Sequence, residues 1–275
     1  MENIVIVKSN GEKENFNPIK LQNSLLGAGA SQEAINKILE HIASEIKDGI
    51  STDQIFKHAH FLLEKIEKPS ALRYSLRRAV MDLGPSGFPF EKFIAEIMKE
   101  KGFSVETDKI VKGHCAEHEM DVIAYNDEKL IMIEAKFHNE LTLKSDLKVA
   151  LYIKARFDDL RSQTFNFGGK ERKLDESWLV TNTKFSSSAI GYGNCQKLKM
   201  IGWNFPAQGN LQDLIRDSGL DPLTSLTTLS GSQKKLLLDK GIVLRKTIKD
   251  NKELLKEIGL SDAETDEVYN EASLI

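Results

Sequence analysis

The feature that most constrains this chain is an apolar hairpin with charged groups on its strands. Residues 121–125 predict one strand, 126–128 a turn, and 130–137 the returning strand. Side chains alternate along a strand, so Glu134 and Lys136 share one face of the second strand. The pattern therefore brings Asp121 and Glu134, from adjoining strands, to a single point, with Lys136 beside them.

Charges in this setting favour a functional role. A carboxylate or an ammonium group is costly to bury without a partner, and Mg²⁺ together with a phosphate is a natural partner for this set. His118 and Glu119 precede Asp121 and are expected at the rim, where they orient water or DNA. His114, Cys115 and His118 do not make a four-ligand zinc set. The hairpin thus predicts a centre for phosphodiester chemistry.

Composition and charge limit the remaining possibilities. The chain has 275 residues, enough for two or three domains, and its 40% hydrophobic and 29% charged content is ordinary for a globular protein. A net charge of −3 gives no overall attraction to nucleic acid, so contact with DNA must depend on local patches. The most basic stretch carries Lys144, Lys148, Lys154, Arg156 and Arg161. The acidic pair Asp158-Asp159 within it is expected to form a solvated face.

The expected location follows from what the sequence lacks. No apolar run approaches the length of a membrane span, and the first residues show no signal-peptide pattern. The two cysteines, Cys115 and Cys195, provide neither a disulfide framework nor a four-cysteine zinc site. A reducing cytoplasm is therefore the expected compartment.

Residues 1–84 predict a β-hairpin followed by helices. Asn10-Gly11 is a strong hairpin-turn dipeptide, and Asn17-Pro18 is typical of an N-cap with proline at the first helical position. Residues 51–54 fit a capping box that opens a later helix. A turn-rich segment at 83–87 then marks the end of this first domain.

This arrangement resembles the ATP-cone domain, the nucleotide-sensing module of many ribonucleotide reductases. The matching segments are residues 7–11, 14–20 and 73–79. The resemblance implies ATP or dATP as an effector, bound by Lys8, Asn10, Gly11 and Lys20. Ser9-Asn10 replaces the usual Arg-Asp pair of the family, and arginine is the better fork for phosphate. Lys8 and Lys20 either converge on a triphosphate or are solvated surface charges.

Residues 85–222 predict a mixed sheet flanked by helices. A helical pattern opens near Phe90 and ends at Gly102, and the charged hairpin follows it. The later elements are a helix at 145–163, a buried strand at 178–182, a helix at 189–199 and a short strand at 201–203. This order indicates an α/β class, α+β overall, with the small hairpin-plus-helices domain in front.

The order of elements and four sites in them resemble the Mrr-like branch of the PD-(D/E)xK restriction endonucleases. Glu91 lies on the early helix, Asp121 matches the metal-binding aspartate, Glu134-Ala135-Lys136 matches the Glu-x-Lys, and 179–185 matches a later strand. The resemblance implies DNA as substrate and Mg²⁺ (or Mn²⁺) held by Asp121, Glu134 and the Ala135 carbonyl. Lys136 would position or deprotonate water, or stabilise charge on phosphorus. Glu91 is either a further ligand or a first-turn residue favoured by the helix dipole.

Residues 223–275 predict short helices separated by glycine-containing turns. The pattern resembles tandem helix-hairpin-helix modules, which bind DNA phosphates through backbone amides. The end of the chain is acidic, with Asp262, Glu264, Asp266 and Glu267, which disfavours DNA. A packing or dimerisation element is an equal alternative for this tail.

Two functions remain open on these grounds. One is a metal-dependent endodeoxyribonuclease of the type IV or Mrr-like kind, regulated by ATP or dATP, for which the resemblance implies restriction of foreign DNA. The other is a nucleotide-responsive DNA-binding regulator that does not cut; the complete set of acids and lysine favours the first. A reductase subunit is excluded because no redox cysteine constellation follows the front domain. A homo-oligomer is expected, because cutting two strands is easiest with a dimer.

Overall fold

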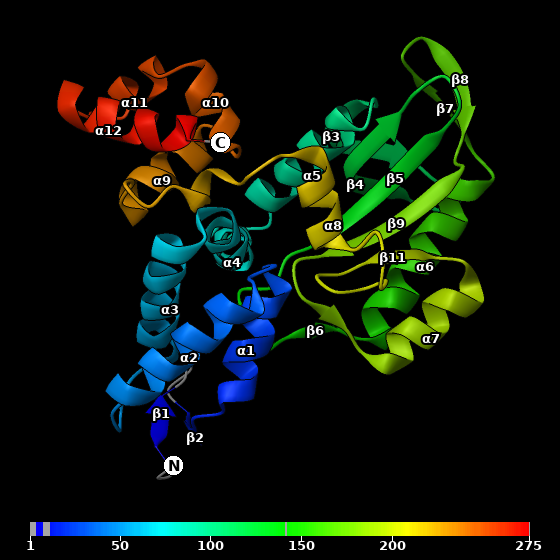
Figure 1. Ribbon diagram of the computed structural model, residues 1–275. Helices are drawn as coiled ribbons and strands as arrows, with labels where there is room; N and C mark the ends of the chain where they lie inside the picture. The colour runs from blue at the N-terminus through cyan, green and yellow to red at the C-terminus, as the bar shows by residue number, and fades with distance from the viewer. Residues whose placement is uncertain (1–3, 8–11, 141, 275) are drawn as a thin grey trace. The chain divides into compact units, whose positions relative to one another are not determined.

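The computed structural model describes residues 4–7, 12–140 and 142–274 (Figure 1). The chain divides into two compact units, Met1–Arg78 and Ala79–Ile275. Within the described ranges, no helix combines the length and the apolar character that crossing a bilayer requires.

The first unit is a two-stranded antiparallel hairpin followed by helices. Its elements are β1 (Val5–Val7), β2 (Lys13–Asn15), α1 (Pro18–Gly27), α2 (Gln32–Glu45), α3 (Thr52–Ile66) and most of α4 (Lys68–Met81). The Asn17 side chain accepts a hydrogen bond from the Ile19 backbone N–H, and Ser51 and Gln54 form a capping box at α3. The predicted pairing of the two hairpin strands, the N-cap and the capping box are thus confirmed, while the predicted Asn10-Gly11 turn lies outside the described residues.

The second unit is built on a five-stranded mixed sheet with strand order β11-β9-β5-β4-β3. The strands are β3 (Ser104–Lys112), β4 (Glu117–Tyr125), β5 (Leu130–Lys136), β9 (Glu176–Thr181) and β11 (Lys199–Ile201). The first three form an antiparallel meander, whereas β9 runs parallel to β5 and β11 parallel to β9. Strand β5 lies at the centre of the sheet, and its first four residues are all buried, as expected for a strand covered on both faces.

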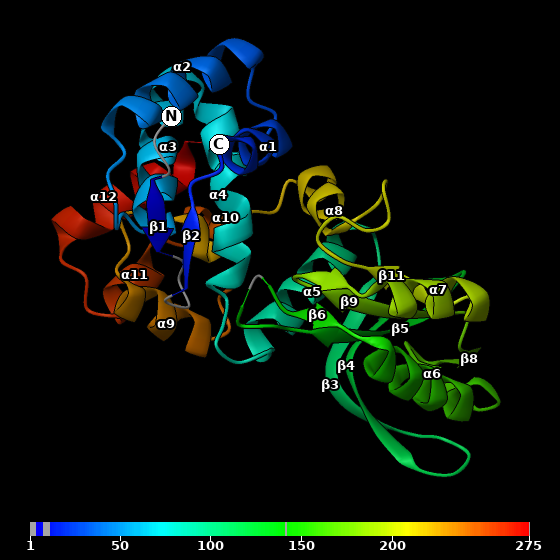
Figure 2. The same cartoon turned by 90° about the horizontal axis from the view of Figure 1, so that it is seen from below.

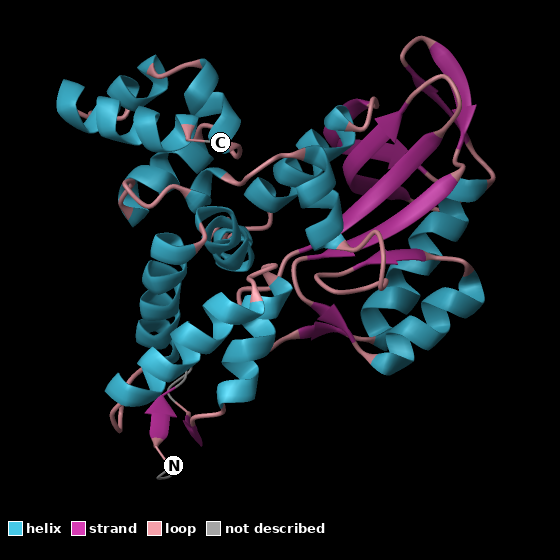
Figure 3. Ribbon diagram, in the orientation of Figure 1, coloured by secondary structure: helices cyan, strands magenta, loops and turns pink. Residues whose placement is uncertain are grey.

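Helices cover both faces of this sheet (Figures 1 and 2). They are α5 (Phe88–Glu100) and α8 (Leu211–Ser218) on one face, and α6 (Leu147–Arg161) and α7 (Ser187–Gln196) on the other. Phe157 and Leu160 of α6 share a hydrophobic cluster with Met132 and Leu179 of the sheet. Figure 3 separates the strands from the helices around them. The predicted fold class, a mixed α/β domain behind a small N-terminal domain and ahead of C-terminal helices, is confirmed.

Two small strand pairs and a run of short helices complete the unit. The pairs are β6 (Lys144–Ser145) with β10 (Lys184–Phe185), and β7 (Thr164–Phe167) with β8 (Lys170–Lys173). The last helices are the 3₁₀ turn η1 (Leu223–Ser225), α9 (Gly231–Asp239), α10 (Arg245–Asp250), α11 (Glu253–Glu257) and α12 (Asp262–Ser273). The Thr224 hydroxyl donates to the Ala79 carbonyl, which ties these helices to the start of the unit.

Glu271 of α12 holds the segment between η1 and α9. Its carboxylate accepts hydrogen bonds from the backbone N–H and the hydroxyl of both Thr227 and Thr228, at 2.5 to 2.9 Å. Burial pushes the pKa of Glu271 upward, but these bonds, led by the Thr228 hydroxyl, hold it below its ordinary value. The ionised form of Glu271 is therefore the one that the folded chain prefers.

We expect Glu271→Ala to lower the free energy of unfolding by about 2 kcal/mol near neutral pH, because hydrogen bonds to a charged acceptor are lost. The folded pKa is depressed, so this stabilisation is present above the unfolded pKa and disappears as the pH falls through the folded pKa. Urea unfolding at neutral and acidic pH measures both effects. Glu267→Ala, at an exposed position of the same helix, is the matched control and should change stability by less than about 0.5 kcal/mol. Equal losses in the two variants would contradict the assignment.

Candidate functional site

Strands β4 and β5 separate where the sequence placed the site. Their paired residues end at Val122 opposite Ile133, so Asp121 and Glu134 would be the next pair. Instead, the Asp121 Oδ2 atom accepts a hydrogen bond from the backbone N–H of Ala135 at 2.7 Å. Strand β5 continues its pairing with β9 as far as Lys136. A carboxylate thus takes the place of a backbone hydrogen bond, and the sheet opens around it.

Three acids lie close enough there to affect one another's ionisation. Burial is the main cause that raises the pKa of Asp121. Burial, and next the charge of Asp121, raise the pKa of Glu134 to about 7. Burial, followed by the charges of Asp121, Asp108 and Glu134, raises the pKa of Glu91 to about 7. Half-buried acids that repel each other favour either a proton or a cation.

Glu91 occupies the first-turn position that the sequence predicted, and its role as a further ligand stays a prediction. It lies in the first turn of α5, where its backbone N–H donates to the Gly87 carbonyl at 3.0 Å. Its carboxylate folds back over the start of the helix, since a Cβ added to Gly87 would lie 2.9 Å from Glu91 Oε1. The charges that raise its pKa include those of Asp121 and Glu134, so the same side chain also faces the acidic group.

Lys136 is the last residue of β5 and is exposed. Burial and the charge of Asp121 raise the pKa of Glu134, while Arg156 and, less strongly, Lys136 act in the opposite direction. The Lys136 charge, after burial, also lowers the pKa of His138. Ala135 points to the other face of the strand and is buried. The structure therefore brings Asp121, Glu134, Glu91 and Lys136 to the end of the sheet at which β5 finishes.

Asp108 of β3 is an acid that the sequence reasoning missed. It has a φ of 54°, between the strand pairs Thr107–Val122 and Lys109–Met120. A left-handed conformation costs a residue other than glycine roughly 1–2 kcal/mol, and such strain is concentrated at functional sites. The Asp108 charge contributes to the raised pKa of both Glu91 and Asp121. A lone aspartate in a polar strand carries no signal that could have singled it out.

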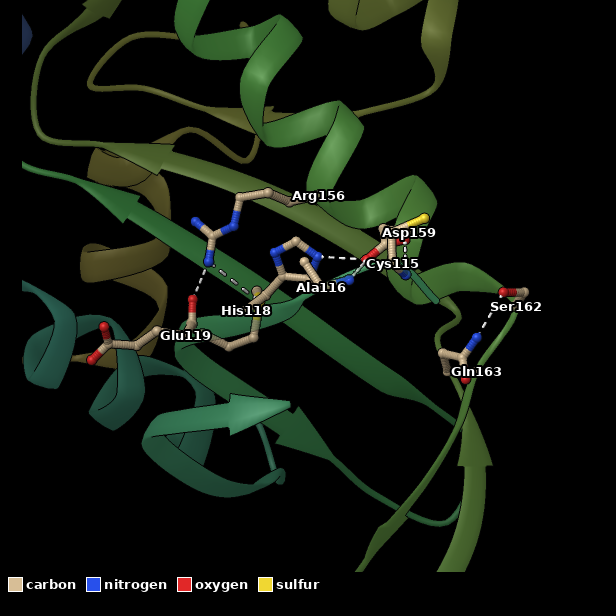
Figure 4. A network of polar contacts seen from close by, with 9 residues as sticks. Cys115, Ala116, His118, Glu119, Arg156, Asp159, Ser162 and Gln163 are labelled. Atoms are coloured by element: carbon tan, nitrogen blue, oxygen red, sulfur yellow. Dashed lines mark hydrogen bonds and ion pairs between the residues drawn. The ribbon is translucent and has the colours of Figure 1, made fainter. Parts of the chain in front are cut away.

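Arg156 of α6 is the second residue that the sequence did not place here. Its Nη1 atom lies 2.7 Å from Glu134 Oε2, and both side chains are largely buried, with 12% and 17% exposed. Its Nη2 atom donates to the backbone carbonyl of Glu119, whose carboxylate points away from the guanidinium (Figure 4). Although Arg156 belongs to the most basic stretch of the sequence, its guanidinium is largely buried and is used by Glu134 and the Glu119 carbonyl.

A second contact from α6 holds the turn between β3 and β4 (Figure 4). The Asp159 carboxylate accepts hydrogen bonds from the backbone N–H groups of Cys115 and Ala116, and lies 2.8 Å from His118 Nε2. The hydrogen bond to His118, aided by the two N–H groups, lowers the pKa of Asp159. The solvated face expected for Asp159 was wrong, and His118 is engaged with this aspartate.

The donor chemistry of the acidic group fits a divalent ion that prefers oxygen. Glu134 binds Arg156 through Oε2 and Asp121 binds Ala135 through Oδ2, which leaves Glu134 Oε1 and Asp121 Oδ1 to face a cation. Among the described residues, a set of three ligating side chains within 4.8 Å of one another occurs elsewhere, at His41, Glu45 and His58. The acidic group does not meet this criterion, and Mg²⁺, which keeps several waters, does not require that three side chains lie so close.

The raised pKa values predict a pH dependence. Glu91 and Glu134 have a higher pKa in the folded chain than in the unfolded chain. They therefore stabilise the metal-free fold at pH values below their unfolded pKa, and this stabilisation is lost as the pH rises through about 7. A divalent ion needs the ionised forms, so Mg²⁺ or Mn²⁺ should bind at least about tenfold more tightly at about pH 8 than at about pH 6. Calorimetric titration at the two pH values measures this. Equal affinities would contradict the placement of the ion at Glu134.

The residues expected to bind nucleotide are only partly visible. Lys8, Asn10 and Gly11 lie outside the described residues. Lys20 lies on α1, where its Nζ is 2.9 Å from both carboxylate oxygens of Glu14 and its side chain is 63% exposed. A phosphate at Lys20 would therefore compete with Glu14.

Three family models match the chain. They are an ATP cone domain over residues 4–79, a restriction endonuclease domain over residues 85–204, and an AF1548-like C-terminal domain over residues 222–275. The predicted order, an ATP-cone domain fused to a restriction-endonuclease-like domain, is confirmed.

Individual relatives extend these matches. An uncharacterised protein of Archaeoglobus fulgidus is 35% identical over 182 residues, which cover 66% of this chain and 99% of that protein. The crystal structure of a protein of unknown function, AF1548, is 34% identical with a TM-score of 0.56, covering 68% of this chain and 96% of that one. The MspJI restriction endonuclease in complex with a 27-mer oligonucleotide is 13% identical with a TM-score of 0.36, covering 77% of this chain and 44% of that one. That last likeness is too slight to support an argument.

Proposed function

This chain belongs to the AF1548-like family and carries an ATP-cone domain ahead of a restriction-endonuclease-like domain, and from these two facts we propose that it is a metal-dependent endodeoxyribonuclease. The restriction-endonuclease-like domain indicates a nuclease. The proposed metal-dependent cleavage is supported by the separation of β4 from β5 around Asp121 and Glu134, with Lys136 at the end of β5 beside them. DNA is the proposed substrate, and restriction of foreign DNA the proposed role.

Each residue of the site has a defined part in this proposal. Asp121, Glu134 and the Ala135 carbonyl would hold Mg²⁺ or Mn²⁺, because hard cations prefer oxygen ligands. The bound ion would polarise the scissile phosphate and lower the pKa of a bound water. Lys136 would orient that water, or take its proton as the neutral amine; as an ammonium group it would instead offset the negative charge that develops on the phosphate. Glu91 would contact the ion through a water or would help to hold a second ion.

Arg156 is the positioning residue of this site. By holding Glu134 Oε2, it fixes the carboxylate so that Oε1 is directed away from the guanidinium. Its hydrogen bond to the Glu119 carbonyl fixes the guanidinium itself on β4. Arg156 thus limits the rotation of Glu134, and the orientation of the proposed ligand depends on α6.

Fewer basic side chains are available for the proposed contact with DNA than the basic stretch of the sequence contains. Lys154 is buried and paired with Asp158, and Arg156 is used by Glu134. Lys144, Lys148 and Arg161 remain exposed for contact with phosphates. Because contacts of this kind release counterions, DNA binding should weaken steeply with salt.

Nicking of supercoiled plasmid in a titration of Mg²⁺ or Mn²⁺ tests the proposal directly. Conversion to open-circular or linear DNA that requires the ion supports the nuclease. Salt-sensitive DNA binding without cleavage, at any concentration of either ion, would instead identify a nucleotide-responsive DNA-binding regulator. Neither cleavage nor binding would overturn both functions.

We expect ATP or dATP to bind the first unit in a saturable way below millimolar concentration, with Lys20 among the phosphate contacts. Equilibrium dialysis should show Lys20→Ala weakening the binding by about tenfold, since one charge-assisted contact is lost. Lys37→Ala is the matched control, because Lys37 is also an exposed helical lysine paired with a glutamate of the same unit. Equal dialysis results for the two variants would contradict the assignment of Lys20.

Light scattering with and without dATP tests the proposed homo-oligomer. A monomer under both conditions would contradict that proposal.

A further inference from the structure

Three potential metal ligands converge on one point of the first unit. His41 and Glu45 lie one helical turn apart on α2, and His58 lies on α3. Glu45 stands between the two imidazoles: His41 Nε2 is 3.3 Å from Glu45 Oε1, and His58 Nε2 is 3.5 Å from Glu45 Oε2. One ligand atom from each residue can be chosen so that all three lie within 4.8 Å of one another.

The two histidine–glutamate separations are close to those between neighbouring ligands of a tetrahedral ion, although each involves a different oxygen of Glu45. Two ligand atoms that each lie about 2.1 Å from one Zn²⁺ are about 3.4 Å apart at the tetrahedral angle. The two imidazole rings stand edge to face with their centroids 5.1 Å apart, so neither ring stacks over the other and covers its nitrogen. Small rotations of the three side chains would therefore suffice to place an ion between them.

The packing of α2 and α3 fixes the backbone positions of these residues. Ile42, next to His41, and Ala59, next to His58, are buried in the core of the unit. The backbones that carry the imidazoles are thus positioned by apolar contacts that do not depend on an ion. The side chains themselves are 43%, 53% and 30% exposed for His41, Glu45 and His58, so ions in solution can reach them.

We propose that His41, Glu45 and His58 form a binding site for a transition-metal ion of the Zn²⁺ class, which bridges α2 and α3. Imidazole nitrogen with one carboxylate suits Zn²⁺, Ni²⁺ and Cu²⁺, whereas Mg²⁺ prefers oxygen ligands alone. Three protein ligands leave a fourth position open to water. The site is independent of the acidic group on the sheet, which belongs to the second unit.

The preference for nitrogen ligands allows a direct test on the full chain. Co²⁺ is titrated first, and then Zn²⁺ as its competitor, in millimolar Mg²⁺ so that oxygen-only sites are already filled. The visible absorption of Co²⁺ reports low-coordinate nitrogen ligation. His41→Gln and His58→Gln are the test variants. His60→Gln is the matched control, because His60 lies on the same helix and stacks on Phe56 rather than joining the cluster.

The expected result is one tight equivalent of metal in the wild type and in His60→Gln, with Kd raised at least about tenfold in both test variants. Zn²⁺ should also raise the Tm of the wild type, and this shift should be lost in the test variants, because the ion joins two helices of the folded unit. Absence of Co²⁺ absorption in the wild type would overturn the proposal. So would equal affinity in His58→Gln and His60→Gln, which would leave Glu45 as an ion-pair partner of the two histidines.

Discussion

Asp121→Asn and Lys136→Ala are each expected to reduce metal-dependent cleavage of plasmid DNA by roughly a thousandfold or more. Asparagine keeps an oxygen that can accept the Ala135 N–H, so the sheet should stay intact while the charge that holds the ion is lost. Lys136→Ala removes the cation at the end of β5, which the proposed mechanism places beside the water and the phosphate. Single-turnover nicking rates at saturating Mg²⁺ measure the loss.

The control variant for this experiment lies on the same hairpin. Lys129 immediately precedes β5, is exposed and pairs with Glu176, so Lys129→Ala should cleave at the wild-type rate. All variants should unfold at nearly the wild-type temperature, which separates lost chemistry from lost structure. Wild-type cleavage by purified Lys136→Ala would remove this lysine from the mechanism.

A large loss of folding stability is expected when Arg156 is replaced. Arg156→Met leaves the largely buried Glu134 without its partner, and breaking such a pair costs about 3 kcal/mol or more. The loss should be greatest at about pH 8. Burial and the Asp121 charge already raise the pKa of Glu134 to about 7, and removal of Arg156 raises that pKa further, so a proton compensates as the pH falls. Mg²⁺ should also reduce the loss, because it supplies the missing positive charge.

Urea unfolding in a double-mutant cycle isolates this pair. Glu134→Gln removes the charge that Arg156 neutralises, so Arg156→Met should cost much less in that background. Arg161→Met, at an exposed position of the same helix, is the matched control. Equal destabilisation by Arg156→Met with and without the Glu134 charge would show that Arg156 acts through packing and the Glu119 carbonyl alone.

Much of the fold could be predicted because its signals are local. The apolar runs at 121–125 and 130–137 and the turn at 126–128 indicated the hairpin of β4 and β5, and Asn17 and Ser51 marked helix starts through their own neighbours. The position of Glu134 next to Asp121 followed from the same alternation. Such features depend on a few consecutive residues, and tertiary contacts did not override them.

The remaining site residues depend on contacts between distant segments. Arg156 and Asp159 share α6 with solvent-facing residues, and nothing in the helical pattern shows that one reaches Glu134 and the other reaches the turn before β4. His41 and Glu45 have a visible one-turn spacing, but His58 joins them only through the packing of α2 on α3. The left-handed backbone of Asp108 likewise belongs to the assembled sheet.

Because Asp121 binds the Ala135 amide, the presence of this aspartate in a relative does not by itself indicate that the relative is catalytically active. Both Asp121 and Glu134 have structural partners, the amide and Arg156, so a lineage that had ceased to cut would still gain by keeping them. Lys136 forms no hydrogen bond or ion pair with any residue in the described part of the chain. Under the proposed mechanism, we therefore expect the lysine to be the better marker of nuclease activity among relatives of this protein.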